Sequence, residues 1–137
     1  MTISYNRLGS NGRLGNQMFQ YASLRGIANY NQYQWMIPPP DYNHKDNYGL
    51  FDTFEMKHCK PENLGFNDGM TITEKTHAFD DGLFYCTDGV NIDAYLQTED
   101  YFVHIADQIH EDFTFKKDYL EPCQEFISSL GSSPIFI

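Results

Sequence analysis

The sequence predicts an α/β fold in which helices flank a parallel sheet. The extended run Ile3–Leu8 leads through three glycines into a helical segment from about Asn16, and Tyr33–Ile37 then alternates like a second strand. A helix between two strands is typical of a βαβ unit, whose strands lie parallel. At 137 residues the chain suits one domain, 1–137, and we expect a Rossmann-like sheet with flanking helices.

The first strand and the first helix both carry apolar residues at the period of their element. Residues 3–6 alternate apolar and polar, which predicts a strand with one buried face. One broad face of the helix carries Met18, Tyr21, Ala22, Leu24 and Ala28. Because Phe19 and Ile27 point elsewhere, we expect this helix to be covered on two sides and to end near Asn31.

The glycines between these elements form the first candidate binding loop. Gly9, Gly12 and Gly15 permit positive φ and allow close approach of a ligand. The start of the helix offers free N–H groups and a partial positive charge, and Arg13 adds a full one, so the loop could hold a phosphate or a sugar hydroxyl. An ordinary tight turn explains the glycines equally well, since their spacing matches neither common phosphate-binding motif.

Two further strands are expected in the second half of the chain. Met70–Glu74 and Ile92–Leu96 alternate, and Thr98 is placed to cap a helix that begins near Glu99. In open α/β sheets, ligands bind beyond the carboxyl ends of the strands. We therefore expect Gln97, like Asn16, to face a cleft.

The remaining apolar segments predict packing. Leu50–Phe54 should bury two aromatic rings. A helical core face is predicted from Tyr101, Phe102, Ile105 and Ile109. A second helical stripe consists of Leu120, Cys123, Ile127 and Leu130. In that helix Pro122 is expected in the first turn and Gly131 at the end, and Pro134–Ile137 resembles a buried parallel strand.

The charge balance excludes some partners. Lys and Arg total 9 against 19 Asp and Glu, which gives a net charge of −10. No basic cluster is available to neutralise phosphates, so we expect no nucleic acid partner and no attraction to an anionic membrane surface. A nucleotide sugar would need local positive charge, and Arg13 and Arg25 are the candidates nearest the glycine loop.

Neither cysteine nor histidine spacing indicates a metal site. Cys59, Cys86 and Cys123 are odd in number and widely spaced, as expected for reduced thiols. Asp80 and Asp81 are adjacent, whereas metal-dependent sugar transferases carry Asp-x-Asp. We expect no metal ion.

The start of the sequence carries no apolar segment of signal-peptide or membrane-spanning length. We therefore expect a cytoplasmic protein, and peripheral association with a membrane is left open.

Three stretches resemble one family of enzymes in the right order. Gly12–Ala22 reads GRLGNQMFQYA and is similar to the N-terminal signature of the family 11 glycosyltransferases, the α-1,2-fucosyltransferases. Asn91–Phe102 looks like that family's GYFQSEKYF segment, and Ile109–Phe115 resembles its IREDFTF segment. The chain departs from the family at Ala94, where glycine is usual, and it lacks the His-x-Arg-Arg-x-Asp motif that follows the last strand in the family.

The resemblance implies the N-terminal domain of a two-domain, GT-B-like enzyme, truncated before its C-terminal nucleotide-sugar domain. The implied reaction is inverting transfer of fucose from GDP-fucose to a galactoside acceptor, without a cofactor. The implied substrate-binding residues are Gly12, Arg13, Gly15, Asn16, Gln17 and Gln97. No general base is assigned.

Because the missing motif grips the nucleotide sugar in the family, we expect the chain to be inactive alone. A complementary C-terminal chain is then a further expected partner. A glycan-binding or partner-binding fragment without catalysis is the alternative.

Overall fold

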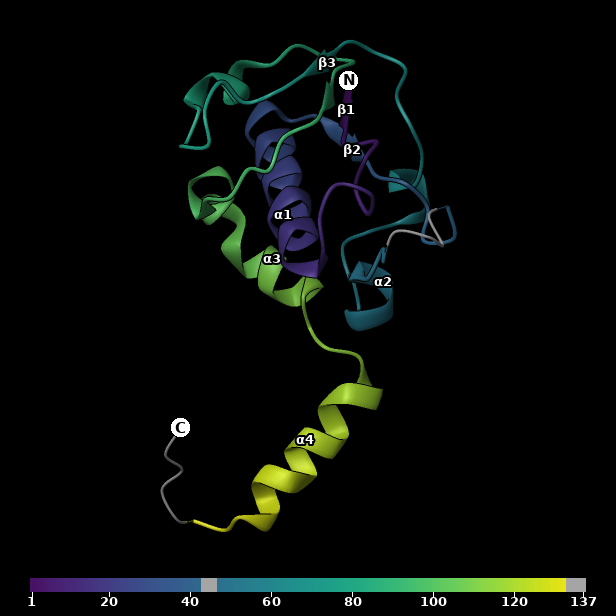
Figure 1. The fold of residues 1–137 in the computed structure, drawn as a ribbon, viewed down its shortest axis with the longest axis vertical. Helices are drawn as coiled ribbons and strands as arrows, with labels where there is room; N and C mark the ends of the chain where they lie inside the picture. The colour runs from purple at the N-terminus through teal and green to yellow at the C-terminus, as the bar shows by residue number, and fades with distance from the viewer. Residues whose placement is uncertain (43–46, 133–137) are drawn as a thin grey trace.

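The computed structural model describes residues 1–42 and 47–132, and its centre is a four-stranded parallel sheet (Figure 1). The strands are β1 (Thr2–Ser4), β2 (Gln34–Met36), β3 (Thr71–Ile72) and β4 (Asn91–Ile92). Their order is β2-β1-β4-β3, and all three pairings are parallel. The prediction of an α/β fold with a parallel sheet and flanking helices is confirmed.

The long helix α1 (Leu14–Asn31) packs on this sheet and is covered on several sides. It contacts β1 and β2, and also the 3₁₀ turns η2 (Asp81–Tyr85), η3 (Glu99–Tyr101) and η4 (Val103–Ile105). Every residue from Gln20 to Ala28 is buried. The predicted cover on two sides is therefore confirmed, as is the helix end at Asn31.

The strands are shorter than the alternation predicts. The first ends at Ser4, because the chain then turns and Leu8 N donates to Tyr5 O. The last ends at Ile92 rather than Leu96. Ile3, Ser4 and Tyr5 are all buried, so the expectation of a single buried face for the first strand is wrong, as is usual inside a parallel sheet.

The segment after β4 is helical in three pieces instead of one. Thr98 caps η3 as predicted, since its side chain accepts from Asp100 N. η4 and the helix α3 (Ala106–Asp112) follow. Of the predicted core face, Tyr101, Ile105 and Ile109 are buried, while Phe102 is half-buried.

Two short helical elements lie between β2 and β3. The helix α2 (Leu50–Thr53) is followed by buried Phe54, and Phe51 packs partly buried against the core, as the sequence predicts. The turn η1 (Pro61–Asn63) lies further along the chain.

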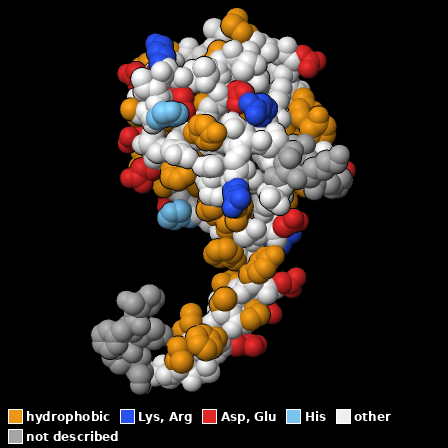
Figure 2. Space-filling view, in the orientation of Figure 1, with side chains coloured by type: hydrophobic (Ala, Val, Ile, Leu, Met, Phe, Trp, Pro, Cys, Tyr) orange, Lys and Arg blue, Asp and Glu red, His pale blue; other side chains and the backbone are white. Residues whose placement is uncertain are grey.

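The helix α4 (Lys117–Ser129) projects away from the body of the molecule (Figure 1). None of its residues is buried, and Figure 2 shows hydrophobic side chains along it. Pro122 is its sixth residue, so the expectation of a first-turn proline is wrong, and Gly131 ends the helix with φ +69° as predicted. The predicted strand Pro134–Ile137 lies outside the described residues.

Among the described residues, no helix combines the length and the apolar character that crossing a membrane requires.

Candidate functional site: a polar cleft at the carboxyl edge of the sheet

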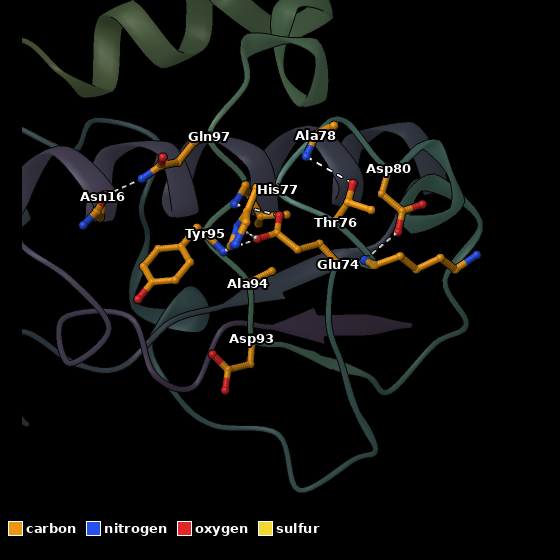
Figure 3. Close-up of polar contacts among 12 residues, drawn as sticks. Asn16, Glu74, Thr76, His77, Ala78, Asp80, Asp93, Ala94, Tyr95 and Gln97 are labelled. Carbon is orange, nitrogen blue, oxygen red and sulfur yellow. Dashed lines mark hydrogen bonds and ion pairs between the residues drawn. The ribbon is translucent and has the colours of Figure 1, made fainter.

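Three loops meet where β1, β3 and β4 end, and they enclose a polar cleft (Figure 3). Two adjoining hollows of about 550 Å³ and 250 Å³ share Glu74, His77 and Tyr95. We call them together the edge cleft. Its wall is completed mainly by Arg7 and Asn11 after β1, and by Asp93 and Gln97 after β4. This is the edge at which parallel α/β sheets bind ligands.

Glu74 fixes the loop that follows β4. Its two carboxylate oxygens accept the backbone N–H groups of Tyr95 and Leu96, each at 3.2 Å, and its side chain is only 8% exposed. Leu96 is fully buried with φ +55°, a left-handed conformation that costs roughly 1–2 kcal/mol for a non-glycine residue. The Glu74 carboxylate thus holds a strained backbone immediately before Gln97.

Gln97 and Asn16, both predicted to face a cleft, contact each other. The Gln97 Nε2 donates to Asn16 Oδ1 at 2.6 Å (Figure 3). The contact joins the start of α1 to the loop after β4, 81 residues apart. Gln97 is exposed and lines the smaller hollow, while Asn16 is half-buried.

A second network braces the other wall of the edge cleft. Asp93 accepts from Arg7 at 3.0 Å and from Asn11 at 3.1 Å, and Asn11 also donates to the Tyr5 hydroxyl at 3.0 Å. The Tyr5 hydroxyl donates in turn to Ala94 O at 2.5 Å. Burial raises the pKa of Tyr5 above its ordinary value, and the hydrogen bond that Arg7 donates to Asp93 raises the pKa of Arg7. Tyr5 therefore stays a neutral donor.

The glycine loop leads into α1 through two turns that require positive φ. Gly9 and Gly12 adopt φ +94° and +108°, and a Cβ at Gly12 would lie 2.5 Å from the Asn16 side chain. The expectation of positive φ is wrong for Gly15, which lies within α1. A Cβ at Gly15 would meet no atom within 4 Å. Packing therefore does not require glycine at that position.

Arg13 is the N-cap residue of α1, and its side chain makes no capping hydrogen bond. The first intrahelical bond runs from Gln17 N to Arg13 O. The N–H groups of Leu14, Gly15 and Asn16 thus precede the helical ladder and remain at the positive end of the helix. The edge cleft is not lined by Gly12, Arg13 or Gly15. Their neighbour Asn16 contacts Gln97, which does line it.

Gln17 has a structural role. Its side chain is fully buried, donates to Gly12 O at 3.1 Å and Asn47 O at 3.0 Å, and accepts from Gly49 N at 3.0 Å. These bonds use both its donors and its acceptor to tie the loop to the segment before α2. The predicted role of Gln17 in substrate binding stays a prediction, and in this structure its side-chain polar atoms are already paired within the chain.

Arg25 is likewise unavailable to a ligand. It is buried in an ion pair with Asp112 and donates to Gln108 at 2.7 Å. Its predicted place near the glycine loop as a source of positive charge is wrong. Arg7, which sequence reasoning missed, supplies a guanidinium to the edge cleft instead.

The cleft residues that the sequence did not reveal follow the ends of the strands. Arg7, Glu74 and Asp93 each lie within three residues of a strand end, but the alternation predicts longer strands and hides these positions. Correct strand ends would have indicated them.

The edge cleft carries groups suited to hydroxyl-rich ligands. Carboxylate, amide and guanidinium groups line it beside the Tyr95 ring, which is 41% exposed. The His77 ring lies 6.5 Å from the Tyr95 ring, and its Nδ1 lies 3.8 Å from Glu74 Oε1. Within residues 1–42 and 47–132, no group of three or more His, Cys, Asp or Glu side chains could hold a metal ion.

Comparison of the chain with models of protein families, with curated proteins and with solved structures finds no match.

Proposed function

We propose that this chain is the N-terminal portion of an inverting galactoside α-1,2-fucosyltransferase, with the N-terminal domain of a GT-B-like enzyme as its fold. One observation carries the proposal. Asn16 and Gln97 belong to two of the three stretches that resemble the family, and they hydrogen-bond at the carboxyl edge of a parallel sheet. If the resemblance were accidental, there would be no reason for these two distant positions to meet at the edge of the sheet where ligands bind.

The proposed ligands are GDP-fucose and a galactoside. In fucosyl transfer the departing diphosphate gains negative charge, which a helix N-terminus and a guanidinium stabilise. Arg13 and the first N–H groups of α1 have this character. The edge cleft would take the galactoside, because its amides and carboxylates can bind hydroxyl groups and the Tyr95 ring offers an apolar face.

His77 is the proposed general base for the acceptor hydroxyl. Its side chain is 92% exposed, and its only ionic partner in the described residues, Glu74, is 3.8 Å away. An exposed imidazole nitrogen can reach an acceptor hydroxyl and take its proton. Asp93, by contrast, is occupied by Arg7 and Asn11.

Binding to the purified chain tests the proposal. Ligand-observed NMR should detect GDP-fucose, methyl β-galactoside or both, and Gln97→Ala should weaken the binding about tenfold or more. Gln124→Ala on α4 removes the same side chain far from the edge cleft and should leave binding unchanged. Absence of binding by both ligands, or binding indifferent to Gln97→Ala, would contradict the proposal.

A transfer assay separates the enzyme from the alternative of a non-catalytic glycan-binding or partner-binding fragment. We expect binding without turnover by the isolated chain, because the resemblance assigns the nucleotide grip to His-x-Arg-Arg-x-Asp. Adding a complementary C-terminal chain that carries this motif should then yield α-1,2-linked product. Binding that never leads to transfer, even with such a chain, would favour the non-catalytic fragment.

A further inference from the structure

The helix α4 presents an apolar stripe that nothing in the described residues covers. The stripe consists of Tyr119, Leu120, Cys123, Phe126, Ile127 and Leu130. Phe126 is 64% exposed, and hydrophobic side chains are visible along the helix in Figure 2. The carboxylates Asp118, Glu121 and Glu125 lie on the opposite side. We call this set of six apolar residues the α4 stripe.

The linker before α4 directs the helix away from its own body. Glu55 N donates to Thr114 O at 2.9 Å, and Lys116 N donates to Thr53 O at 3.1 Å. Phe54 and Phe115 form an antiparallel bridge between these two bonds, with ring centroids 5.2 Å apart. These contacts fix residues 114–116 in the orientation from which α4 projects away from the body (Figure 1).

The body carries a matching apolar groove between α1 and α3. The groove has a volume of about 340 Å³. It is lined by Met18, Phe19, Phe102, Ile109, His110 and Phe113. No carboxylate lines it, so the acidic side of an incoming α4 meets no like charge within it. We call this the apolar groove.

We propose that two copies of the chain exchange α4, each helix laying its stripe in the apolar groove of the other copy. The attached linker directs α4 away from the groove of the same chain (Figure 1). An anionic membrane surface suits α4 poorly, since its polar side is acidic. One covered aromatic side chain buries roughly 150–250 Å², so two exchanged helices pass the about 1,000 Å² typical of specific interfaces. Because each copy gives its helix to the other, the dimer is closed and has two-fold symmetry.

Sedimentation velocity over a range of concentrations tests the exchange. The chain of 15.9 kDa should convert from monomer to a species of twice that mass. Ile127→Asp alters the stripe and should raise the dissociation constant roughly a hundredfold or more, because the symmetric dimer contains the change twice. Ser128→Asp is the matched control, since it adds the same charge on the polar side, and it should have little effect.

Mixing two defective variants tests the pairing of helix with groove. Phe19→Gln damages the groove, and Ile127→Asp damages the stripe, so each variant alone should be monomeric. Their mixture retains one intact helix-groove contact and should form a mixed dimer of intermediate affinity.

Three outcomes would overturn the exchange. They are a wild-type chain that stays monomeric at every concentration, equal effects of Ile127→Asp and Ser128→Asp, and a mixture no more associated than either variant alone.

Discussion

At the scale of single residues, two neighbours in the glycine-loop motif have opposite roles. Gln17 is fully buried and holds the loop together through three hydrogen bonds. Asn16 is half-buried and reaches across to Gln97. The motif resemblance does not distinguish these two amide side chains, because both belong to the same stretch, Gly12–Ala22. Their burial distinguishes them.

A pair of alanine substitutions tests this division. Gln17→Ala leaves two carbonyl groups and one N–H group without their partner, and should lower the free energy of unfolding by about 2–4 kcal/mol. Asn16→Ala removes one partly exposed hydrogen bond and should cost less than about 1 kcal/mol, while binding of GDP-fucose or galactoside weakens. Chemical denaturation and ligand titration of both variants give the comparison. A strongly destabilised Asn16→Ala with normal ligand affinity would make Asn16 structural.

Gly15 offers a second test at this scale. Because a Cβ there meets open space, Gly15→Ala should keep the fold and raise the stability by up to about 1 kcal/mol through helix propensity. If a ligand approaches the start of α1 closely, the added methyl group should nevertheless weaken binding. Thermal unfolding and titration with GDP-fucose measure both effects. A variant that is more stable and binds fully would restrict Gly15 to an ordinary turn.

At the scale of elements, a buried carboxylate fastens α1 to α3 and to the chain after α2. Asp112 is fully buried and accepts from Tyr21 Oη at 2.8 Å, from His58 N at 2.6 Å and from Arg25. The Arg25 guanidinium also lies over the Trp35 ring, 5.4 Å from its centroid. The ion pair therefore links α1 with a residue of α3 that lies 87 positions later in the chain.

Removal of this carboxylate should be costly. Asp112→Ala leaves the Arg25 charge buried without its partner, and the expected loss is about 3–5 kcal/mol in the free energy of unfolding. Glu111→Ala is the matched control. Its side chain is 57% exposed, and its one ionic partner within residues 1–42 and 47–132 is His58, so its loss should stay below about 1 kcal/mol. Urea denaturation of the two variants should differ accordingly, and equal losses would contradict the role of Asp112.

The elements themselves were largely predictable, but their ends were not. The periods of α1 and of the strands are local properties of the sequence, and they yield the parallel α/β fold. Strand ends depend on tertiary contacts, such as the hydrogen bonds that the Tyr95 and Leu96 N–H groups donate to the Glu74 carboxylate. The edge cleft was predictable in location through Gln97 and Asn16. The other residues that line it, such as Arg7, Glu74 and Asp93, could not be predicted, because their positions depend on which strands become neighbours in the sheet.

At the scale of the whole molecule, several buried acidic groups resist ionisation. Burial raises the pKa of Tyr5, Tyr21 and Tyr48 above their ordinary value of 10.0. Burial also raises the pKa of Cys59 from 9.0 to about 12. Each of these groups is neutral when protonated, so the folded chain retains their protons at pH values where the unfolded chain loses them.

The stability of the fold should therefore fall on the alkaline side. Below pH 9.0 these groups are protonated in both the folded and the unfolded chain, and their contribution to stability is fully present. The contribution is lost as the pH rises from the ordinary pKa, 9.0 for cysteine and 10.0 for tyrosine, through the raised pKa of the folded chain. Urea midpoints measured at increasing alkaline pH should decline. Tyr48→Phe removes one such phenol and should make the decline shallower, and Tyr42→Phe, at an exposed position outside the α4 stripe, is the matched control. A flat profile above pH 10 would contradict this expectation.

The projection of α4 also implies that its amide protons exchange on a different timescale from those of the body. A helix of 13 residues that no other described part of the chain covers is marginal in water, and Pro122 removes one of its backbone donors. The amides of α1 should exchange with solvent only through global unfolding, while those of α4 should exchange through local fraying in the monomer. Helix formation in α4 then becomes coupled to association, so its deuterium uptake should slow as the protein concentration rises.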